Sequence, residues 1–217
     1  MYDLEANDGK RFPLVIRLGV KMNPDGLIKT VLNFERTKPE SVVLLDDTDE
    51  YGAVWNRVYD ELGFKPGIRE SVPFNIRKPH AVFGIGNMTE EDIDNYVTAC
   101  NDIFAKISKG RVYALDWQHS ALLYDPRDPE GQRDFWTVNS RYDGGGYNVY
   151  FPSFYPDGDY YFFIDEGFEF GLLGHPWRQE IWIFGEPLLS EFGKIYKELG
   201  LTLKETYNGK SIQKADY

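Results

Sequence analysis

The strongest constraint on the fold is a run of three short apolar segments, separated by turn residues, between Tyr155 and Leu189. The segments have the length and the aromatic or β-branched content of strands: DYYFFI at 159–164, FEFGLL at 168–173 and EIWIF at 180–184. Turns as short as Asp165-Glu166-Gly167 and Gly174-His175-Pro176-Trp177 bring successive strands side by side in opposite directions. The stretch predicts a C-terminal three-stranded antiparallel meander, and Gly185-Glu186-Pro187 then begins a helix.

Along the whole chain, apolar residues recur at helical spacing in three places, so we expect about three helices, the last of which is the helix after the meander. They lie at residues 51–62, between Thr89 and Gly110, and at 188–199. Further strands or extended segments are expected at residues 12–22, 27–34, 41–45, 74–86, 111–117, 120–124 and 135–138, and a polar loop at 125–133. Blocks of strands with a few intervening helices indicate an α+β fold with a mostly antiparallel sheet.

Three regions follow from this pattern. Residues 1–50 are expected to form an N-terminal β-hairpin extension, with a turn at Asn23-Pro24-Asp25-Gly26 and residues 41–45 as a third strand. Residues 51–205 are expected to form the α+β domain, and residues 206–217 a disordered tail.

The chain is acidic, with a formal net charge of -11 over 217 residues. Such a chain is repelled by phosphate backbones and anionic lipid surfaces, so neither nucleic acid nor a membrane is an expected partner. The charge either serves solubility or complements a basic surface on a protein partner, steered by the acidic loop at Asp46–Glu50. One cysteine and no apolar run long enough to span a membrane predict a cytoplasmic protein.

No familiar catalytic signature is present: the chain has no phosphate-binding loop, no nucleophile elbow and no HExxH zinc motif. Cys100 falls on the apolar face of the second predicted helix, where a buried thiol is inert. Neither a cofactor nor a metal is expected, because two histidines among scattered carboxylates lack the close spacing of a zinc site.

Polar and aromatic residues instead collect at predicted strand ends. The candidate binding residues are Trp117, His119, Asp157, Asp159, His175 and Trp177. If the strand that ends at Trp117 lies beside the meander, these side chains can meet at one rim of the sheet. A histidine there can act as a base, oriented by Asp116 or Asp159, and the indoles can wall a pocket. The alternative is purely structural, because a tight turn such as Pro-Asp-Gly-Asp needs these residues for its backbone.

Four segments carry a resemblance: ALDWQH at 114–119, YPDGDYY at 155–161, FGLLGHPW at 170–177 and IFGE at 183–186. The sequence resembles the bacterial family known as domain of unknown function 2716, most clearly over residues 112–199 and more weakly back to Trp55. Residues 1–50 do not match it. The resemblance transfers no catalytic role, and it suggests a bacterial or phage origin.

Two functions are expected on these grounds. The first is a binding protein of the immunity or inhibitor type, which blocks a toxin or a defence-system protein by covering its surface. This rests on analogy with other small acidic bacterial proteins. The second is a small-molecule enzyme with a His/Asp site at the rim of the sheet. A third option is a purely structural or oligomer-forming protein.

Overall fold

The computed structural model describes residues 14–22, 28–36, 41–67, 73–117, 119–133, 135–139 and 147–215. By the contacts among its residues, the chain divides into two units, Met1–Ser41 and Val42–Tyr217. The boundary therefore lies several residues before residue 50, where the sequence places it.

The first unit contains one antiparallel pair of strands. β1 (Leu14–Met22) and β2 (Ile28–Arg36) pair along their whole length, from Leu14 opposite Arg36 to Met22 opposite Ile28. The expected turn at 23–26 lies outside the described residues.

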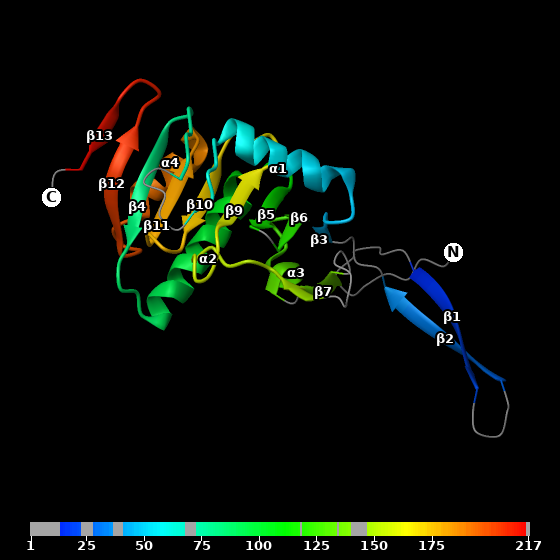
Figure 1. Ribbon diagram of the computed structural model, residues 1–217. Helices are drawn as coiled ribbons and strands as arrows, with labels where there is room; N and C mark the ends of the chain where they lie inside the picture. The colour runs from blue at the N-terminus through cyan, green and yellow to red at the C-terminus, as the bar shows by residue number, and fades with distance from the viewer. Residues whose placement is uncertain are drawn as a thin grey trace. The chain divides into compact units, whose positions relative to one another are not determined.

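The second unit is built on a nine-stranded sheet in which every neighbouring pair is antiparallel (Figure 1). In spatial order the strands are β13 (Ile212–Lys214), β12 (Leu201–Tyr207), β4 (His80–Ile85), β11 (Glu180–Phe184), β10 (Gly171–His175), β9 (Tyr161–Asp165), β5 (Val112–Asp116), β6 (Ser120–Tyr124) and β3 (Val42–Leu44). With the helices described below, the fold class is α+β.

The expected meander is present as β9, β10 and β11, but it is the middle of this large sheet and not a sheet of its own. Its outer strands are almost wholly apolar, so neither can remain an exposed edge without inviting other chains to pair with it. β4 covers the free side of β11, and β5 covers that of β9.

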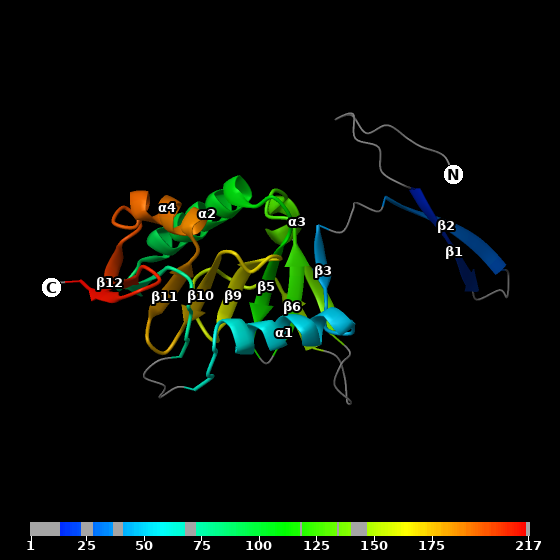
Figure 2. The ribbon, with the colours of Figure 1, turned by 90° about the horizontal axis from the view of Figure 1, so that it is seen from above.

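Helices cover both faces of the sheet (Figure 2). α2 (Glu90–Ile107) and α4 (Glu186–Ile195) lie on one face, and α1 (Asp49–Glu61) lies on the other. Because successive side chains of a strand point to opposite faces, Phe163 joins the core under α2 while Phe162 joins the core under α1.

The described residues contain four helices, one more than expected. The additional helix, α3 (Pro129–Arg133), lies in the segment predicted to be a polar loop. Two further strands, β7 (Trp136–Asn139) and β8 (Tyr147–Tyr150), form a separate two-stranded sheet. Every helix in the described part of the chain is too short or too polar to span a lipid bilayer.

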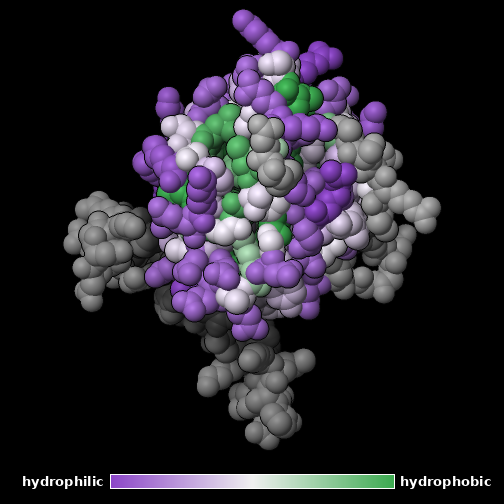
Figure 3. Space-filling model, turned by 90° about the vertical axis from the view of Figure 1, so that its left-hand side faces the viewer, coloured by the Kyte–Doolittle hydropathy of each residue, from purple (hydrophilic) through white to green (hydrophobic). Residues whose placement is uncertain are grey.

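The two edges of the sheet are formed by segments that the sequence assigns differently. β3 pairs with β6, and does not extend the N-terminal hairpin. β12 and β13 occupy residues 201–207 and 212–214, so the described part of the expected tail contains regular strand structure. The end of the unit that carries β12 and β13 presents a mainly hydrophilic surface (Figure 3), which suits an exposed sheet edge.

Candidate functional site

The ends of three interior strands meet at one end of the sheet, which we call its rim. β5 ends at Asp116, which lies opposite Ser120 at the start of β6 and opposite Tyr161 at the start of β9. His119 stands in the turn from β5 to β6, and Asp159 lies two residues before β9. Antiparallel pairing thus brings residues about forty positions apart in the chain to the same place.

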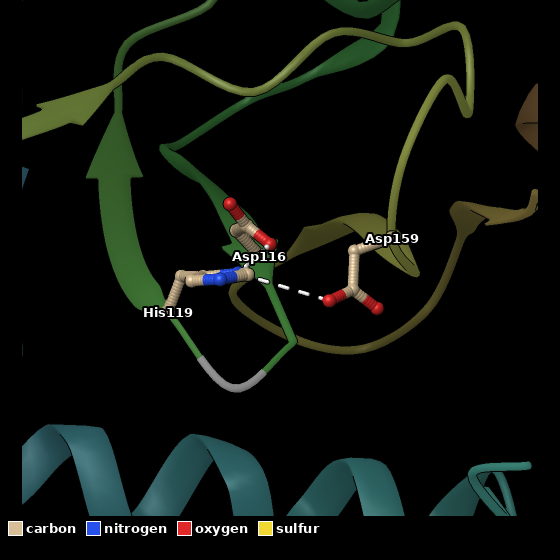
Figure 4. Close-up of side chains that lie close together, drawn as sticks. All are labelled: Asp116, His119 and Asp159. Atoms are coloured by element: carbon tan, nitrogen blue, oxygen red, sulfur yellow. Dashed lines mark hydrogen bonds and ion pairs between the residues drawn. The ribbon is translucent and has the colours of Figure 1, made fainter.

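Asp116, His119 and Asp159 form a cluster that we call the rim site, and their side chains point toward one another (Figure 4). Nδ1 of His119 lies 2.9 Å from Oδ1 of Asp116 and 3.7 Å from Oδ2 of Asp159. The imidazole is half exposed, whereas the two carboxylates are mostly buried.

Backbone hydrogen bonds hold the turn that carries His119 and the side chain of Asp159. The amide of His119 donates to the carbonyl oxygen of Asp116 at 3.1 Å, which closes the turn between β5 and β6. The amide of Tyr160 donates to Oδ1 of Asp159 at 2.7 Å, so the other carboxylate oxygen faces His119. Sites held by strand ends and backbone hydrogen bonds in this way are well ordered.

The surroundings of the rim site shift the pKa of all three of its side chains. Burial raises the pKa of Asp116 to about 6, although its hydrogen bond to His119 opposes the shift. Burial also raises the pKa of Asp159. For His119, burial acts to lower the pKa, but the hydrogen bond to Asp116 and the two carboxylate charges outweigh it, so the pKa is raised. The pKa of each of the three groups is therefore raised, and shifted pKa values are common at functional sites.

A cavity of about 300 Å³ opens beside the rim site. Its walls include Asp116 and His119, together with Asp157 and Tyr161. The Tyr161 hydroxyl hydrogen-bonds to Asp157, and burial and the surrounding carboxylates raise its pKa. The remaining wall consists of Ser120 and the segment 148–153, which comes from β8 and the residues after it. The cavity is thus lined by carboxylate, imidazole, hydroxyl and apolar groups, the mixture typical of small-molecule sites.

A second group forms around the ring of Tyr160, on the face of the sheet that packs against α1. The rings of Trp117, His175 and Trp177 lie 5.7, 4.7 and 5.1 Å from that of Tyr160. His175 is fully buried, and burial lowers its pKa to about 4. Nε2 of His175 lies 3.3 Å from the Tyr160 hydroxyl. His175 is therefore a neutral core residue.

The candidate residues thus fall into two places. His119 and Asp157 line the cavity together with Asp116, and Asp159 lies beside His119, whereas Trp117, His175 and Trp177 surround Tyr160. The predicted pocket between the two histidines and the two tryptophans stays a prediction; the cavity beside His119 is lined by none of the other three.

Sequence reasoning did not select Tyr160, Tyr161 or Asn148. Tyr160 directly precedes β9, which begins at Tyr161. The sequence predicts a strand over residues 159–164, and the alternation of side chains within it was the available signal for two separate groups. Nothing local to Asn148 links it to the rim.

Among the described residues, Asp116, His119 and Asp159 are the group that can hold a metal ion, since one ligand atom from each lies within 4.8 Å of the others.

Comparison with known proteins places the chain among bacterial relatives. The model of the family described as "Protein of unknown function (DUF2716)" matches residues 45–189, more than half of the chain. "Uncharacterized protein YxiI" of Bacillus subtilis (strain 168) is 34% identical over 151 residues, which covers 63% of this chain and 83% of the relative. No solved structure matches significantly. The matched region contains all three residues of the rim site.

Proposed function

The chain belongs to the DUF2716 family, and we propose that it is an enzyme that acts on a small polar molecule at the rim site. The observation that carries this proposal is the 2.9 Å contact between Nδ1 of His119 and Asp116 beside a cavity of about 300 Å³. His119 takes a proton from a bound water or from a substrate hydroxyl, and Asp116 positions the imidazole.

The contact between Nδ1 of His119 and Asp116 supports a separate role for each ring nitrogen. When Nδ1 of His119 donates to Asp116, Nε2 is the unprotonated ring nitrogen and accepts the proton. The imidazolium that forms is stabilised by the carboxylates of Asp116 and Asp159. The arrangement resembles the carboxylate–histidine pair of many hydrolases in its chemistry, and the similarity is one of geometry alone.

The shape and lining of the cavity limit the substrate. A volume of about 300 Å³ lies at the small end of ligand sites, so a metabolite-sized molecule fits better than a polymer chain. Carboxylates on the rim and at Asp157 disfavour an anionic group close to His119. A neutral or cationic substrate that carries hydroxyl or amide groups is therefore favoured.

A metabolite-depletion experiment tests this function. The chain is incubated with the small-molecule fraction of a bacterial extract, and mass spectrometry identifies compounds that disappear. We expect His119→Gln to abolish the conversion and Asp116→Asn to slow it at least about tenfold. Asp94→Asn, which removes an exposed carboxylate from α2, is the matched control and should act like the wild type. A compound consumed equally by His119→Gln would reject the proposal.

A second candidate function is stoichiometric protein binding of the immunity or inhibitor type. It is favoured by two aromatic residues on the β7–β8 sheet: Trp136 and Tyr150 lie opposite each other and are 61% and 63% exposed. Large exposed aromatics are typical anchors of protein interfaces. With a net charge of -11, the chain would suit a toxin or defence protein with a basic surface.

The acidic loop has a smaller role in such binding than its sequence suggests. Asp46 is buried and its Oδ1 accepts the amide of Ala121 at 2.8 Å, so it holds β6 in place. Asp47 and Asp49 are the exposed charges available for steering.

Affinity capture from a host lysate tests the second candidate. Replacing Trp136 and Tyr150 together with alanine should release the captured protein, whereas Ile212→Ala, which changes another exposed apolar residue, should not. Charge reversal at Asp47 and Asp49 should slow association and reduce its dependence on salt. Light scattering separates a foreign partner from a second copy of the chain. Equal capture by all variants would contradict this function.

A further inference from the structure

Two of the spacings between side chains in the rim site are close to those of a metal-binding site. Three ligands about 2.1 Å from one divalent ion lie roughly 3.0 to 3.6 Å from one another, for bond angles between about 90° and 120°. Nδ1 of His119 lies 2.9 Å from Asp116 and 3.7 Å from Asp159, so small side-chain rotations would suffice to admit an ion.

The surroundings of the three side chains also suit a metal. Each side chain comes from a different strand end or turn. The backbone amide of Tyr160 donates a hydrogen bond to Oδ1 of Asp159, the carboxylate oxygen that does not face His119. Hydrogen bonds of this kind orient ligands in known metal sites. The two carboxylates are mostly buried, and no cationic side chain other than His119 forms an ion pair with them among the described residues. A bound cation would neutralise their charge.

The cavity gives an ion open coordination positions. Structural zinc sites are closed by four protein ligands, whereas catalytic sites use three and leave one position for water or substrate. The rim site offers three ligands, and the cavity of about 300 Å³ begins at Asp116 and His119. Ser120, Asp157 and Tyr161 on its wall can hydrogen-bond to a metal-bound water.

We propose that Asp116, His119 and Asp159 bind one divalent transition-metal ion, with Zn²⁺ or Mn²⁺ suited to the mixed nitrogen and oxygen ligands. The inference deepens the proposed function, because it rests on the same site and supplies an agent for the same step. When the ion is bound, its water loses a proton to solvent near neutral pH, and the imidazole acts as a ligand. This proposal departs from the expectation, based on the sequence, that the chain binds no metal.

Metal titration of the full chain tests the proposal. The chain is freed of metal with a chelator, dialysed, and titrated with Zn²⁺ alone by calorimetry and with Mn²⁺ alone by electron paramagnetic resonance. We expect one site per chain. Asp116→Asn, His119→Gln and Asp159→Asn should each weaken binding at least about tenfold, whereas Asp94→Asn should not change it. A stoichiometry of zero, or affinity unchanged in all three variants, would overturn the proposal.

A measurement on the wild type guards against variants that fail to fold. The chain has three histidines, and His80 and His175 are buried. In imidazole NMR spectra, Zn²⁺ should therefore shift the His119 signals and leave the others unchanged. A shift of His80 or His175 alone would overturn the assignment.

The two proposals can fail separately. Turnover that persists in excess chelator, with no metal bound, would contradict the metal-site proposal and leave the proposal that His119 is the base. Tight Zn²⁺ binding at the rim, with no compound consumed from the extract, would support the metal-site proposal and contradict the proposed activity.

Discussion

Asp159 and Tyr160 are consecutive residues that serve two different parts of the molecule. The side chain of Asp159 turns toward His119 at the rim, and that of Tyr160 packs between His175 and Trp177 under α1. Both residues precede β9, which begins at Tyr161, and their opposite orientations separate the carboxylates of the rim from the aromatic group. The two histidines differ in the same way, because His119 at the rim is half exposed and His175 in the aromatic group is fully buried.

The burial of His175 predicts a pH-dependent stability. Its pKa is about 4 in the folded chain, lowered by burial against the opposing charge of Glu180, and about 6.5 when unfolded. Between these values the unfolded chain binds more protons, so the stabilising contribution is complete above pH 6.5 and is lost as the pH falls toward 4. The expected loss between pH 7.5 and pH 5 is about 2 kcal/mol.

Urea denaturation at several pH values measures this contribution. The free energy of unfolding of His175→Phe should vary less between pH 7.5 and pH 5 than that of the wild type, by about 2 kcal/mol. The comparison cancels the titration of the rim carboxylates, which both proteins share. Parallel pH profiles for the two proteins would show that His175 does not titrate as its burial implies.

The candidate site was predictable in its residue types but not in its grouping. Asp116, His119 and Asp159 stand at strand ends, which the sequence locates well. Whether Trp177 faces the same side as His119 depends on the register of β9 and β10 and on which face each strand presents. A shift of one residue reverses every side chain, and turn composition does not determine register to that precision.

Among the elements, α2 shows the clearest agreement between local sequence and structure. Thr89 caps the helix: its hydroxyl oxygen accepts the amide of Asp92, and the Asp92 carboxylate accepts the amide of Thr89. Thr89→Ala should therefore lower the free energy of unfolding by about 1 kcal/mol. Thr98→Ala, at an exposed position within the same helix, should leave stability unchanged or raise it by a few tenths of a kcal/mol. Thermal or urea unfolding of both variants checks the pair, and equal effects would exclude a capping role.

β12 illustrates an element whose place the sequence did not reveal. It pairs with β4, more than a hundred residues earlier in the chain, and Lys204 in β12 lies 2.9 Å from the buried carboxylate of Glu180 in β11. Arg178 binds the same carboxylate at 2.7 Å. Pairings between adjacent segments, such as β9 with β10, follow from short turns, whereas this one depends on long-range packing that a linear pattern does not encode.

The contact at Glu180 should control how firmly β12 is attached. Lys204→Met removes one partner of a buried carboxylate that keeps the other, so we expect a loss of about 1 kcal/mol. Hydrogen exchange should accelerate in β12 more than in β9, because the opening is local. Lys197→Met, at an exposed position, is the control. Uniform acceleration in both strands would instead indicate global destabilisation.

At the scale of the whole molecule, the α+β class followed from the strand blocks, but the extent of the sheet did not. The sequence assigns Ser41–Leu45 to the N-terminal extension because it follows two hairpin strands. The structure instead uses Val42–Leu44 as the edge strand beside β6, and Leu45 and Asp46 are buried in the same unit. A short apolar run next to a predicted hairpin is ambiguous, since only its pairing partner decides which unit it completes.

This difference in the boundary yields a test on two deletions. Removing residues 1–41 should leave residues 42–217 folded, with a melting temperature within about 2 °C of that of the full chain, because the change in stability is below about 1 kcal/mol.

Removing residues 1–50, the extension that the sequence predicts, also deletes β3, Leu45 and the hydrogen bond from Ala121 to Asp46. Burial of Leu45 alone contributes roughly 2 kcal/mol, so the melting temperature should fall by at least about 4 to 8 °C. The uncovered edge of β6 should also promote aggregation. Circular dichroism and light scattering on the two proteins distinguish the boundaries: equal melting of both would place the unit boundary at residue 50, and a large loss already on removing residues 1–41 would show that the N-terminal unit contributes to the fold of the second.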